Sequence, residues 1–433
     1  MNTNTKPFCV LYAAVDTYSG YGARGRDIAK ALIELKGEEW NIKIIPCGWG
    51  ATPSGFTKEN TEWGFLREYF ISSQLTEQPD YMIWNTIPSE AQPIGKYNIL
   101  VTAGIESTIA PADWVEGCER MDLVLGSSKH TIDVLRNSKF DKRDKNTNQT
   151  IGKIDWTKKG DVLFEGAREE VYNPTSSNLE LPEIEDDFCY LFTGMWTPGD
   201  INEDRKNVGL LIKAFLETFK NKSKKPGLIL KTTTIGSSYM DRDEILKRID
   251  IIKSTVKSNN LPNIYLLHGE FSDEEMNELY NHSKVKAMIS LNKGEGFGRP
   301  LLEFSMVNKP IITTKWSGQL DYLKPEFTTL LDGELTNIHP SAANNMLLKE
   351  AQWFSVNHGQ VGIALKDVFE NYKPYLEKAK RQGFYSRNNF TFEKMKDKLS
   401  NIISEFPTFA QKVELKLPTL KKKIELPKLK KLD

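Results

Sequence analysis

Two acidic residues bracket a glycine-rich stretch in the second half of the chain. The sequence at 294–303 reads G-E-G-F-G-R-P-L-L-E, and seven residues separate Glu295 from Glu303. Pro300 is well suited to the first position of a helix, where free N–H groups can hold phosphate oxygens, while carboxylates accept hydrogen bonds from sugar hydroxyls. The pattern favours a loop that approaches a ligand carrying both hydroxyls and phosphates.

Each carboxylate also has a purely structural explanation. The helix dipole favours an acid in the first turn by about 0.3–1 kcal/mol, which would account for Glu303, and Glu295 would then be an exposed loop charge. Neither explanation accounts for the alternation of Gly294, Gly296 and Gly298 with larger side chains. The ligand-binding interpretation is therefore the stronger one.

A second glycine motif lies near the start of the chain. Gly20, Gly22 and Gly25 form G-x-G-x-x-G between a predicted strand and a predicted helix, the spacing of a dinucleotide-binding turn. The acid expected at the end of the second strand is missing, because that strand runs into P-C-G-W at 46–49. Three interpretations stay open: a turn that lets the helix pack closely, a turn whose amides approach a phosphate or sugar, and a nicotinamide or flavin site.

The elements that would position these residues alternate between apolar runs and helical patterns. This alternation predicts parallel sheets with helices on both faces, in two successive doubly wound α/β halves that bind ligands beyond the carboxyl ends of their strands. We expect strands near 8–15, 40–46, 81–84, 98–102, 123–126, 188–194, 228–234, 263–268, 287–291 and 310–314. We expect helices near 26–35, 208–219, 243–257, 273–282, 300–307, 342–354, 361–381 and 393–406, and a surface loop at 139–159.

A chain of 433 residues is too long for one ordinary core, so two domains are expected. The polar, acidic, proline-bounded stretch 174–187 is the predicted linker between them. The predicted division is a first domain at 1–173, a second domain at 188–385, a helix at 386–411 that packs back on the first domain, and a basic tail at 412–433.

Charge is balanced overall, with 58 basic and 58 acidic residues, but it is unevenly placed. The tail at 412–433 has eight lysines and three acids, and its L-P-T-L-K-K segment recurs as L-P-K-L-K-K. Its prolines forbid one continuous helix. It is either a solvated extension or a docking segment for an anionic surface, membrane or nucleic acid.

Cysteine usage and hydropathy give an expectation about location. The four cysteines are far apart without a C-x-x-C pair, which fits a reducing compartment and not a disulfide framework or zinc knuckle. No apolar run approaches the ~18 residues of a membrane span, and the first residues lack a signal-peptide cleavage pattern. We expect a cytoplasmic protein, with peripheral membrane contact through the tail as one option.

At the opening stretch, E-G-F-G-R-P-L-L-E, the chain resembles the family-4 retaining glycosyltransferases. The resemblance implies the GT-B architecture, an α/β fold in which two Rossmann-like doubly wound domains face a central cleft. It covers most of residues 8–325, and the specific matches lie in the second domain. They are T-G-M-W with D-R-K-N-V-G-L-L-I-K-A-F at 193–215, H-G-E-F-S-D-E-E-M-N-E-L-Y at 268–280, and K-P-I-I-T-T-K-W-S-G-Q-L-D-Y-L at 309–323. Weaker matches are S-G-Y-G-A-R-G at 19–25, 104–115, 121–128 and 164–167.

The resemblance implies a role for each matching residue. Lys206 would neutralise the diphosphate of a nucleotide sugar, Glu303 would bind its ribose, and Glu295 would contact the donor sugar ring. The implied catalytic residues are Lys206, Glu295 and Arg205. The implied donor-binding residues are Glu303, Gly296, Phe297, Gly298, Arg299, Gly20 and Gly22, with Glu106 on the acceptor side.

The chain departs from the family pattern at two places. The arginine that usually follows the glycine of the T-G segment is replaced by Met195, so Arg205 or Arg299 would have to supply the second phosphate-binding cation. The first domain offers Glu106 where many members have a histidine, as in a subgroup with an E-(S/T)-T motif. The five histidines are scattered and are interpreted as structural, with His268 at a strand end as the one to watch.

The sequence therefore predicts a retaining glycosyltransferase that uses a nucleotide diphosphate sugar as co-substrate, without a cofactor or metal. The acceptor is left open among a glycan, a lipid, a protein and a DNA base, as are the sugar, the nucleotide and the oligomeric state. Two alternatives from other classes are a sugar-binding scaffold on the same fold and a NAD-dependent oxidoreductase.

Overall fold

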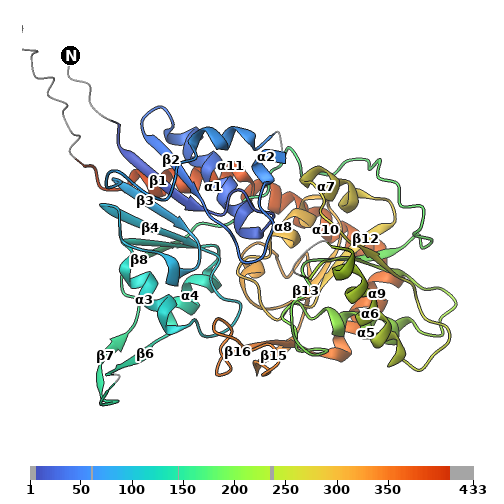
Figure 1. Ribbon diagram of the computed structural model, residues 1–433. Coiled ribbons are helices and arrows are strands. Elements are labelled where there is room, and N and C mark those ends of the chain that lie inside the picture. The colour runs from blue at the N-terminus through green and yellow to red at the C-terminus, as the bar shows by residue number, and fades with distance from the viewer. Residues whose placement is uncertain (1–5, 60–61, 145, 235–237, 410–433) are drawn as a thin grey trace, which may run out of the picture.

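Two six-stranded sheets form the centres of two domains (Figure 1). The computed structural model describes residues 6–59, 62–144, 146–234 and 238–409, so the basic tail at 412–433 lies outside the described residues. The first sheet has the order β2-β1-β3-β4-β5-β8 and the second β11-β10-β9-β12-β13-β14. All neighbouring strands in both sheets are parallel, as the alternation of strands and helices predicts.

The strands of both sheets are short and mostly buried. The first sheet contains β1 (Phe8–Ala13), β2 (Asn41–Pro46), β3 (Tyr81–Asn85), β4 (Tyr97–Thr102), β5 (Leu123–Gly126) and β8 (Lys159–Val162). The second contains β9 (Cys189–Thr193), β10 (Gly227–Lys231), β11 (Ile264–Leu267), β12 (Val285–Ser290), β13 (Ile311–Thr314) and β14 (Thr329–Leu331). Two antiparallel hairpins lie outside the sheets, β6 (Phe140–Arg143) with β7 (Thr150–Ile154), and β15 (Gly333–Asn337) with β16 (Gln352–Val356).

Helices cover both faces of each sheet. The first domain has α1 (Gly20–Lys36), α2 (Phe56–Glu59), α3 (Ala112–Arg120), α4 (Lys129–Asn137) and the 3-10 turns η1 (Gly64–Tyr69) and η2 (Pro88–Glu90). The second has α5 (Val208–Phe219), α6 (Tyr239–Ser254), α7 (Asp273–Asn281), α8 (Arg299–Met306), η3 (Gly318–Asp321), α9 (His358–Glu370) and α10 (Tyr372–Asn389). Helix α11 (Phe392–Ser404) follows α10 in the described part of the chain.

The strand order decides where ligands can bind. In the first sheet the order changes direction between β1 and β3, and in the second between β9 and β12. Loops that leave neighbouring strands in opposite directions at such a point open a crevice beyond the carboxyl ends of the strands. The loops after β9 and β12 lead into α5 and α8, so both predicted charge-bearing segments of the second domain begin at this crevice.

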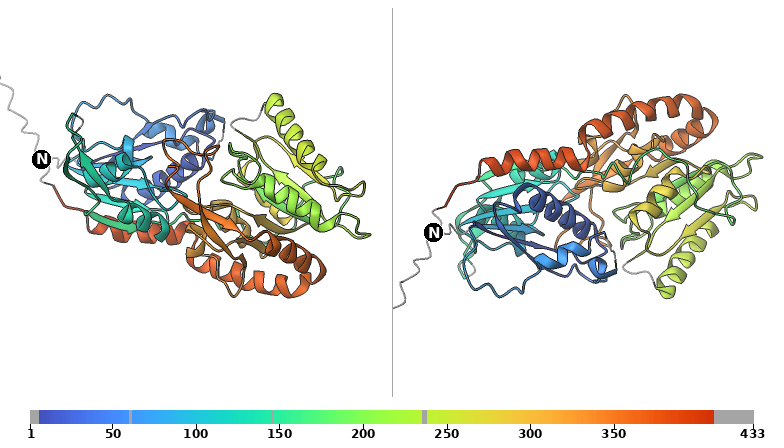
Figure 2. Two further views of the ribbon diagram at one scale, coloured as in Figure 1. Left: turned by 90° about the horizontal axis from the view of Figure 1, so that it is seen from below. Right: turned by 90° about the horizontal axis from the view of Figure 1, so that it is seen from above.

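Helix α11 follows the second domain in sequence but belongs to the core of the first. Its residues Phe392, Met395, Leu399 and Ile403 are buried in the same apolar cluster as α1 and the strands of the first sheet. Two further views show this red helix along the first domain, whereas α10 lies on the second (Figure 2). None of the helices in the described ranges combines the length and apolarity that a bilayer crossing requires.

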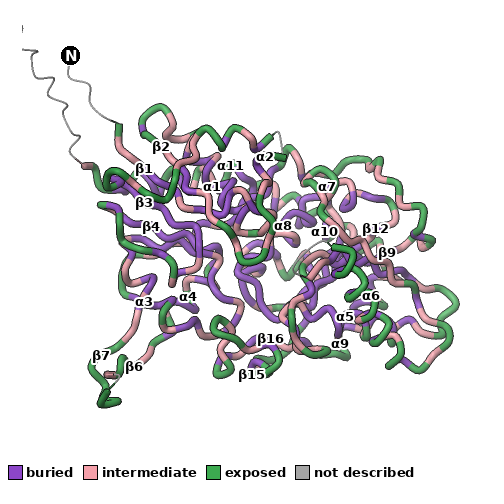
Figure 3. The backbone as a smooth tube through the Cα atoms, viewed as in Figure 1, coloured by how far each residue is buried: buried purple, intermediate pink, exposed green. Residues whose placement is uncertain are grey.

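The structure corrects several predicted elements. Residues 139–159 contain the β6–β7 hairpin, whose exposed strands project from the first domain (Figure 3). The helix predicted at 342–354 is absent, because this stretch is the loop between β15 and β16 and the start of β16. The helix predicted at 361–381 is two helices that meet at Asn371. The turn predicted at 20–25 is the first part of α1, which Ser19 caps through the amide of Gly22.

Replacement of Met395 by alanine tests how α11 contributes to the first domain. The side chain is fully buried, so its removal should lower the free energy of unfolding by about 2–5 kcal/mol. Lys394→Ala on the exposed side of the same helix is the matched control and should change it by less than about 0.5 kcal/mol. Thermal denaturation of both variants measures the difference, and equal melting temperatures would contradict the packing role of α11.

Candidate functional site

A cavity of about 530 Å³ lies between the two domains at the carboxyl ends of the strands. The second domain contributes the loop 295–300 and the start of α8, and the first contributes the start of α1 and the loop after β4. Of the residues selected from the sequence, the cavity is lined by Gly20, Glu106, Arg205, Glu295, Gly296, Phe297, Gly298 and Arg299. Lys206, Glu303 and Gly22 are not among the lining residues, but Lys206 and Glu303 pair with Glu295 and Arg299, which are.

Four charged side chains form a chain across the cavity wall. The Nζ of Lys206 lies 2.5 Å from Oε1 of Glu295, and Nη1 of Arg205 lies 3.6 Å from Oε2 of the same carboxylate. The same Arg205 nitrogen is 3.2 Å from the Glu106 carboxylate of the first domain. It also donates a hydrogen bond to the carbonyl of Gly294 at 3.1 Å. Two cations of one loop thus converge on Glu295, and one of them reaches across to the other domain.

Burial and neighbouring charges shift the pKa values of Glu295 and Lys206 in opposite directions. Burial alone would raise the pKa of Glu295, but the charges of Lys206 and Arg205 outweigh it and hold the pKa below its ordinary value. Burial lowers the pKa of Lys206, and the carboxylate of Glu295 opposes this only in part. The backbone amide of Glu295 donates to Oγ of Ser317 at 2.9 Å, which holds the loop in place.

Arg299 joins the two domains through a second set of charges. Its Nη1 donates to Oδ2 of Asp27 in α1 at 2.5 Å, and its Nε donates to Oε1 of Glu303, one turn along α8, at 2.8 Å. Burial raises the pKa of Glu303 to about 7, although the charge of Arg299 opposes the shift. Asp27 is a site residue that sequence reasoning did not select, because no motif marks it and the contact forms only in the folded chain.

The glycines of the 294–298 loop are explained largely by contact between the domains. A Cβ at Gly294 would lie 2.3 Å from the carbonyl oxygen of Glu106, and one at Gly296 would lie 2.3 Å from that of Ala103. Gly298 has φ 88°, a left-handed conformation that favours glycine, and it caps α8. The alternation that suggested a ligand therefore also lets two backbones approach one another.

The first glycine motif contributes less to the cavity than its spacing suggests. Gly20 lines it, whereas a Cβ at Gly22 would lie 2.4 Å from the carbonyl oxygen of Thr17. Close packing of α1 on the preceding loop accounts for Gly22. Trp49, in the P-C-G-W stretch at 46–49, also lines the cavity. The sequence analysis did not select it as a site residue.

The histidines lie apart from these charges. His268 is 2.7 Å from the carboxylate of Asp241, within the second domain, and does not line the cavity. His130 is partly buried, and this burial lowers its pKa to about 4; its ring meets Trp316 edge-on. Within the described ranges, no group of three or more His, Cys, Asp or Glu side chains is arranged to hold a metal ion.

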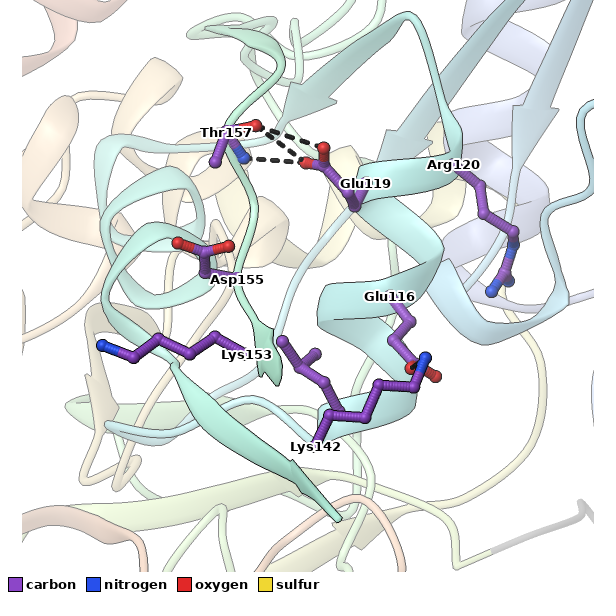
Figure 4. Close-up of a pocket in the computed structure, with 8 residues that line it drawn as sticks. Glu116, Glu119, Arg120, Lys142, Lys153, Asp155 and Thr157 are labelled. Carbon is purple, nitrogen blue, oxygen red and sulfur yellow. Dashed lines mark hydrogen bonds and ion pairs between the residues drawn. The ribbon is translucent and has the colours of Figure 1, made fainter. Parts of the chain in front are cut away.

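A second cavity, of about 590 Å³, lies in the first domain between α3 and the β6–β7 hairpin (Figure 4). In this cavity Lys142 pairs with Glu116 at 3.4 Å, and Glu119 accepts hydrogen bonds from Thr157. It holds none of the residues selected from the sequence. The interdomain cavity is therefore the candidate active site.

Comparison with known proteins agrees with this geometry. Residues 203–339, which contain Arg205, Lys206, Glu295 and Glu303, match the family described as glycosyl transferases group 1. A search of the curated proteins with this sequence finds no match.

Three solved structures share the overall fold. A glycosyltransferase from Rickettsia africae ESF-5 aligns with a TM-score of 0.60 at 15% identity, over 92% of this chain and 98% of that chain. Sucrose-phosphate synthase (tll1590) from Thermosynechococcus elongatus aligns with a TM-score of 0.59 at 11% identity, over 92% of this chain and 98% of that chain. Anabaena Alr3699/HepE in complex with UDP and glucose aligns with a TM-score of 0.56 at 11% identity, over 92% of this chain and 100% of that chain.

These likenesses establish the fold class predicted from the sequence. The two parallel sheets and their helices form the GT-B fold, with two Rossmann-like domains. The family match in the second domain adds the activity: the chain is a glycosyltransferase.

Replacement of Gly296 by alanine tests the close approach of the two domains. The added Cβ would clash with the backbone carbonyl of Ala103, so the closed arrangement should weaken by about 1–3 kcal/mol. The radius of gyration measured by solution X-ray scattering should then increase. Gly48→Ala, where nothing lies within 4 Å of the new Cβ, is the matched control and should leave it unchanged. A Gly296→Ala protein with the wild-type scattering curve would show that this contact does not hold the domains together.

Proposed function

We propose that this glycosyltransferase transfers a sugar from a nucleotide diphosphate donor with retention of configuration at the anomeric carbon. The observation that carries the proposal is the convergence of Lys206 and Arg205 on Glu295 beside the N-terminus of α8. Structural neighbours solved with UDP or UDP-glucose support a donor of this class. The Glu-x7-Glu pattern supports assignment to the family-4 retaining enzymes.

The proposed chemistry rests on stabilisation of the leaving group. The bond between the anomeric carbon and the diphosphate oxygen breaks, and a bond to the acceptor oxygen forms on the same face of the sugar. The acceptor hydroxyl gives its proton to the departing phosphate oxygen, so that no protein base is needed. Lys206, Arg205 and the free amides at the start of α8 stabilise the charge that develops on the diphosphate.

Arg205 fills the place of the arginine that is missing after Gly194. Its guanidinium lines the cavity 3.6 Å from the carboxylate that Lys206 also contacts, so both cations reach one anionic group. Arg299 is less suited to this role, because Asp27 and Glu303 already neutralise it. In the proposed complex the diphosphate takes over part of the contact that Glu295 makes in the free protein, and Glu295 turns to the donor sugar.

Fixed protein cations at this position support a mechanism that does not depend on a metal ion. The positive charge that a metal would place on the diphosphate is supplied here by two side chains and a helix terminus. Addition of a chelator to the transfer assay tests this part of the proposal directly.

Replacement of Lys206 by alanine tests the leaving-group role. Wild-type protein is incubated with a panel of nucleotide sugars, and release of nucleoside diphosphate identifies the donor. With that donor, Lys206→Ala should lower kcat by about 10²–10³-fold, because one contact to the developing charge is lost. Lys213→Ala, an exposed lysine on α5, is the matched control and should keep wild-type turnover. Full turnover in Lys206→Ala would remove this lysine from the mechanism.

The raised pKa of Glu303 predicts a pH dependence of donor binding. The carboxyl titrates at a pKa of about 7 and accepts hydrogen bonds from ribose hydroxyls best when ionised. The donor KM should therefore fall as the pH rises through 7, and Glu303→Gln should raise the donor KM about tenfold and abolish this inflection. Glu244→Gln on α6 is the control, since its carboxylate is exposed. A Glu303→Gln enzyme with the wild-type KM profile would place the ribose elsewhere.

A further inference from the structure

Part of the cavity lining differs in character from the charged residues around Glu295. Here the lining is mainly apolar and aromatic and comes from both domains: Tyr21, Trp49, Ile87, Ile105 and Trp114 from the first, Met346 and Leu347 from the second. The same cavity is also lined by Arg24 and Glu165 of the first domain. The composition indicates a second subsite, next to the one proposed for the donor.

Two stacked rings form a rigid platform in this subsite. The rings of Trp49 and Tyr21 lie with centroids 3.8 Å apart and planes inclined by 23°. The Tyr21 hydroxyl accepts a hydrogen bond from the amide of Ala103 at 3.0 Å and shares a hydrogen bond with the Thr102 hydroxyl at 3.1 Å. These two bonds fix the Tyr21 ring. Trp49 itself is only partly buried and lines the cavity, so the platform is available to a ligand.

A loop of the second domain that reaches the first domain forms another part of the cavity lining. The segment 338–351 connects β15 to β16, and Leu347 from it packs against the apolar core of the first domain. At its base the amide of Thr108 donates to the carbonyl of Gln352 at 2.8 Å, and the amide of Gln352 donates to the Thr108 hydroxyl at 2.9 Å. The loop is thereby held against the first domain.

Two polar residues of the cavity lining are suited to bind hydroxyls. The carboxylate of Glu106 and the side-chain amide of Asn344 line the same cavity. Glu106 also lies 3.2 Å from Arg205, so it connects this set to the residues proposed for the donor. A flat aromatic platform with a carboxylate and an amide beside it matches a pyranose ring, whose C–H face is apolar and whose hydroxyls point outward.

We propose that the acceptor is a carbohydrate whose terminal ring packs on Trp49, between the Trp49–Tyr21 platform and the 338–351 loop, with a hydroxyl directed at the donor site beside Glu106. This inference rests on the proposed glycosyl transfer and specifies its acceptor. That hydroxyl oxygen forms the new bond to the anomeric carbon, and its proton leaves with the diphosphate.

The first experiment identifies the acceptor class with defined probes. Wild-type protein and its donor are incubated separately with methyl glycosides of common hexoses, with octanol, with a serine-containing peptide and with a single-stranded oligonucleotide, and products are detected by mass spectrometry. Transfer to one or more methyl glycosides is the expected result. Transfer to octanol, peptide or oligonucleotide and to none of the glycosides would overturn the proposal.

The second experiment tests the platform. Trp49→Ala should raise the KM for the glycoside acceptor by about tenfold and raise the donor KM far less, whereas Trp49→Phe should recover most of the acceptor affinity because it keeps a ring face. Phe384→Ala, which removes an aromatic ring that is 68% exposed on α10, is the matched control and should change neither KM. An unchanged acceptor KM in Trp49→Ala would contradict the role of the platform.

A separate measurement keeps this inference distinct from the proposed function. If the wild-type protein releases no nucleoside diphosphate from any donor, glycosyl transfer from such donors fails. Titration of the protein's tryptophan fluorescence with the methyl glycosides then tests the subsite alone. A saturable change that Trp49→Phe loses supports the subsite, and no change at any concentration overturns it.

Discussion

The buried guanidinium of Arg299 joins the two domains beside the cavity. It belongs to the second domain and lies between Asp27 of the first domain and Glu303 of its own helix, with exposed side-chain fractions of 14%, 1% and 9%. Taking such charges out of water is costly, and the group is stable only while all three partners stay together. The contact joins α1 to α8 next to the cavity that Arg299 lines. The glycines at 294 and 296 add to it, because they let the loop after β12 approach the first-domain backbone.

A second consequence of burial concerns the cations of the cavity. Lys206 and Arg205 are held in place by Glu295 and Glu106 before any ligand arrives. Side chains that are already ordered lose little further freedom when an anion replaces one of these carboxylates, and such preorganisation makes fixed charges effective in catalysis. In the proposed donor complex, Glu295 would therefore compete with the diphosphate for Lys206 and Arg205.

The sequence predicted most of the sheet strands and the helices at 208–219, 273–282 and 300–307, because continuous apolar runs and helical spacing are local signals. The resemblance to a glycosyltransferase family also selected Arg205, Glu106 and the 295–299 loop, and the structure places all of them around one cavity. What it missed depends on contacts between distant residues. The stretch 342–354 has apolar residues at helical spacing but is a loop and strand whose partners are β15 and the first domain. Asp27 and Trp49 belong to no sequence motif. Asp27 matters because it pairs with Arg299 of the other domain, and Trp49 matters because its ring stacks on Tyr21 of α1.

The position of α11 has a consequence for how the protein is made. The apolar face of the first domain that includes Trp40 and Tyr81 is covered by Phe406, whose ring lies 6.4 Å and 5.5 Å from theirs. A ribosome that has synthesised the first sheet has not yet produced this cover, whereas residues 189–389 hold all the strands of the second sheet in one continuous segment. Domains usually mature in the order in which they leave the ribosome. Here the domain that emerges first is completed last, and its uncovered face is the surface that a chaperone would meet during translation.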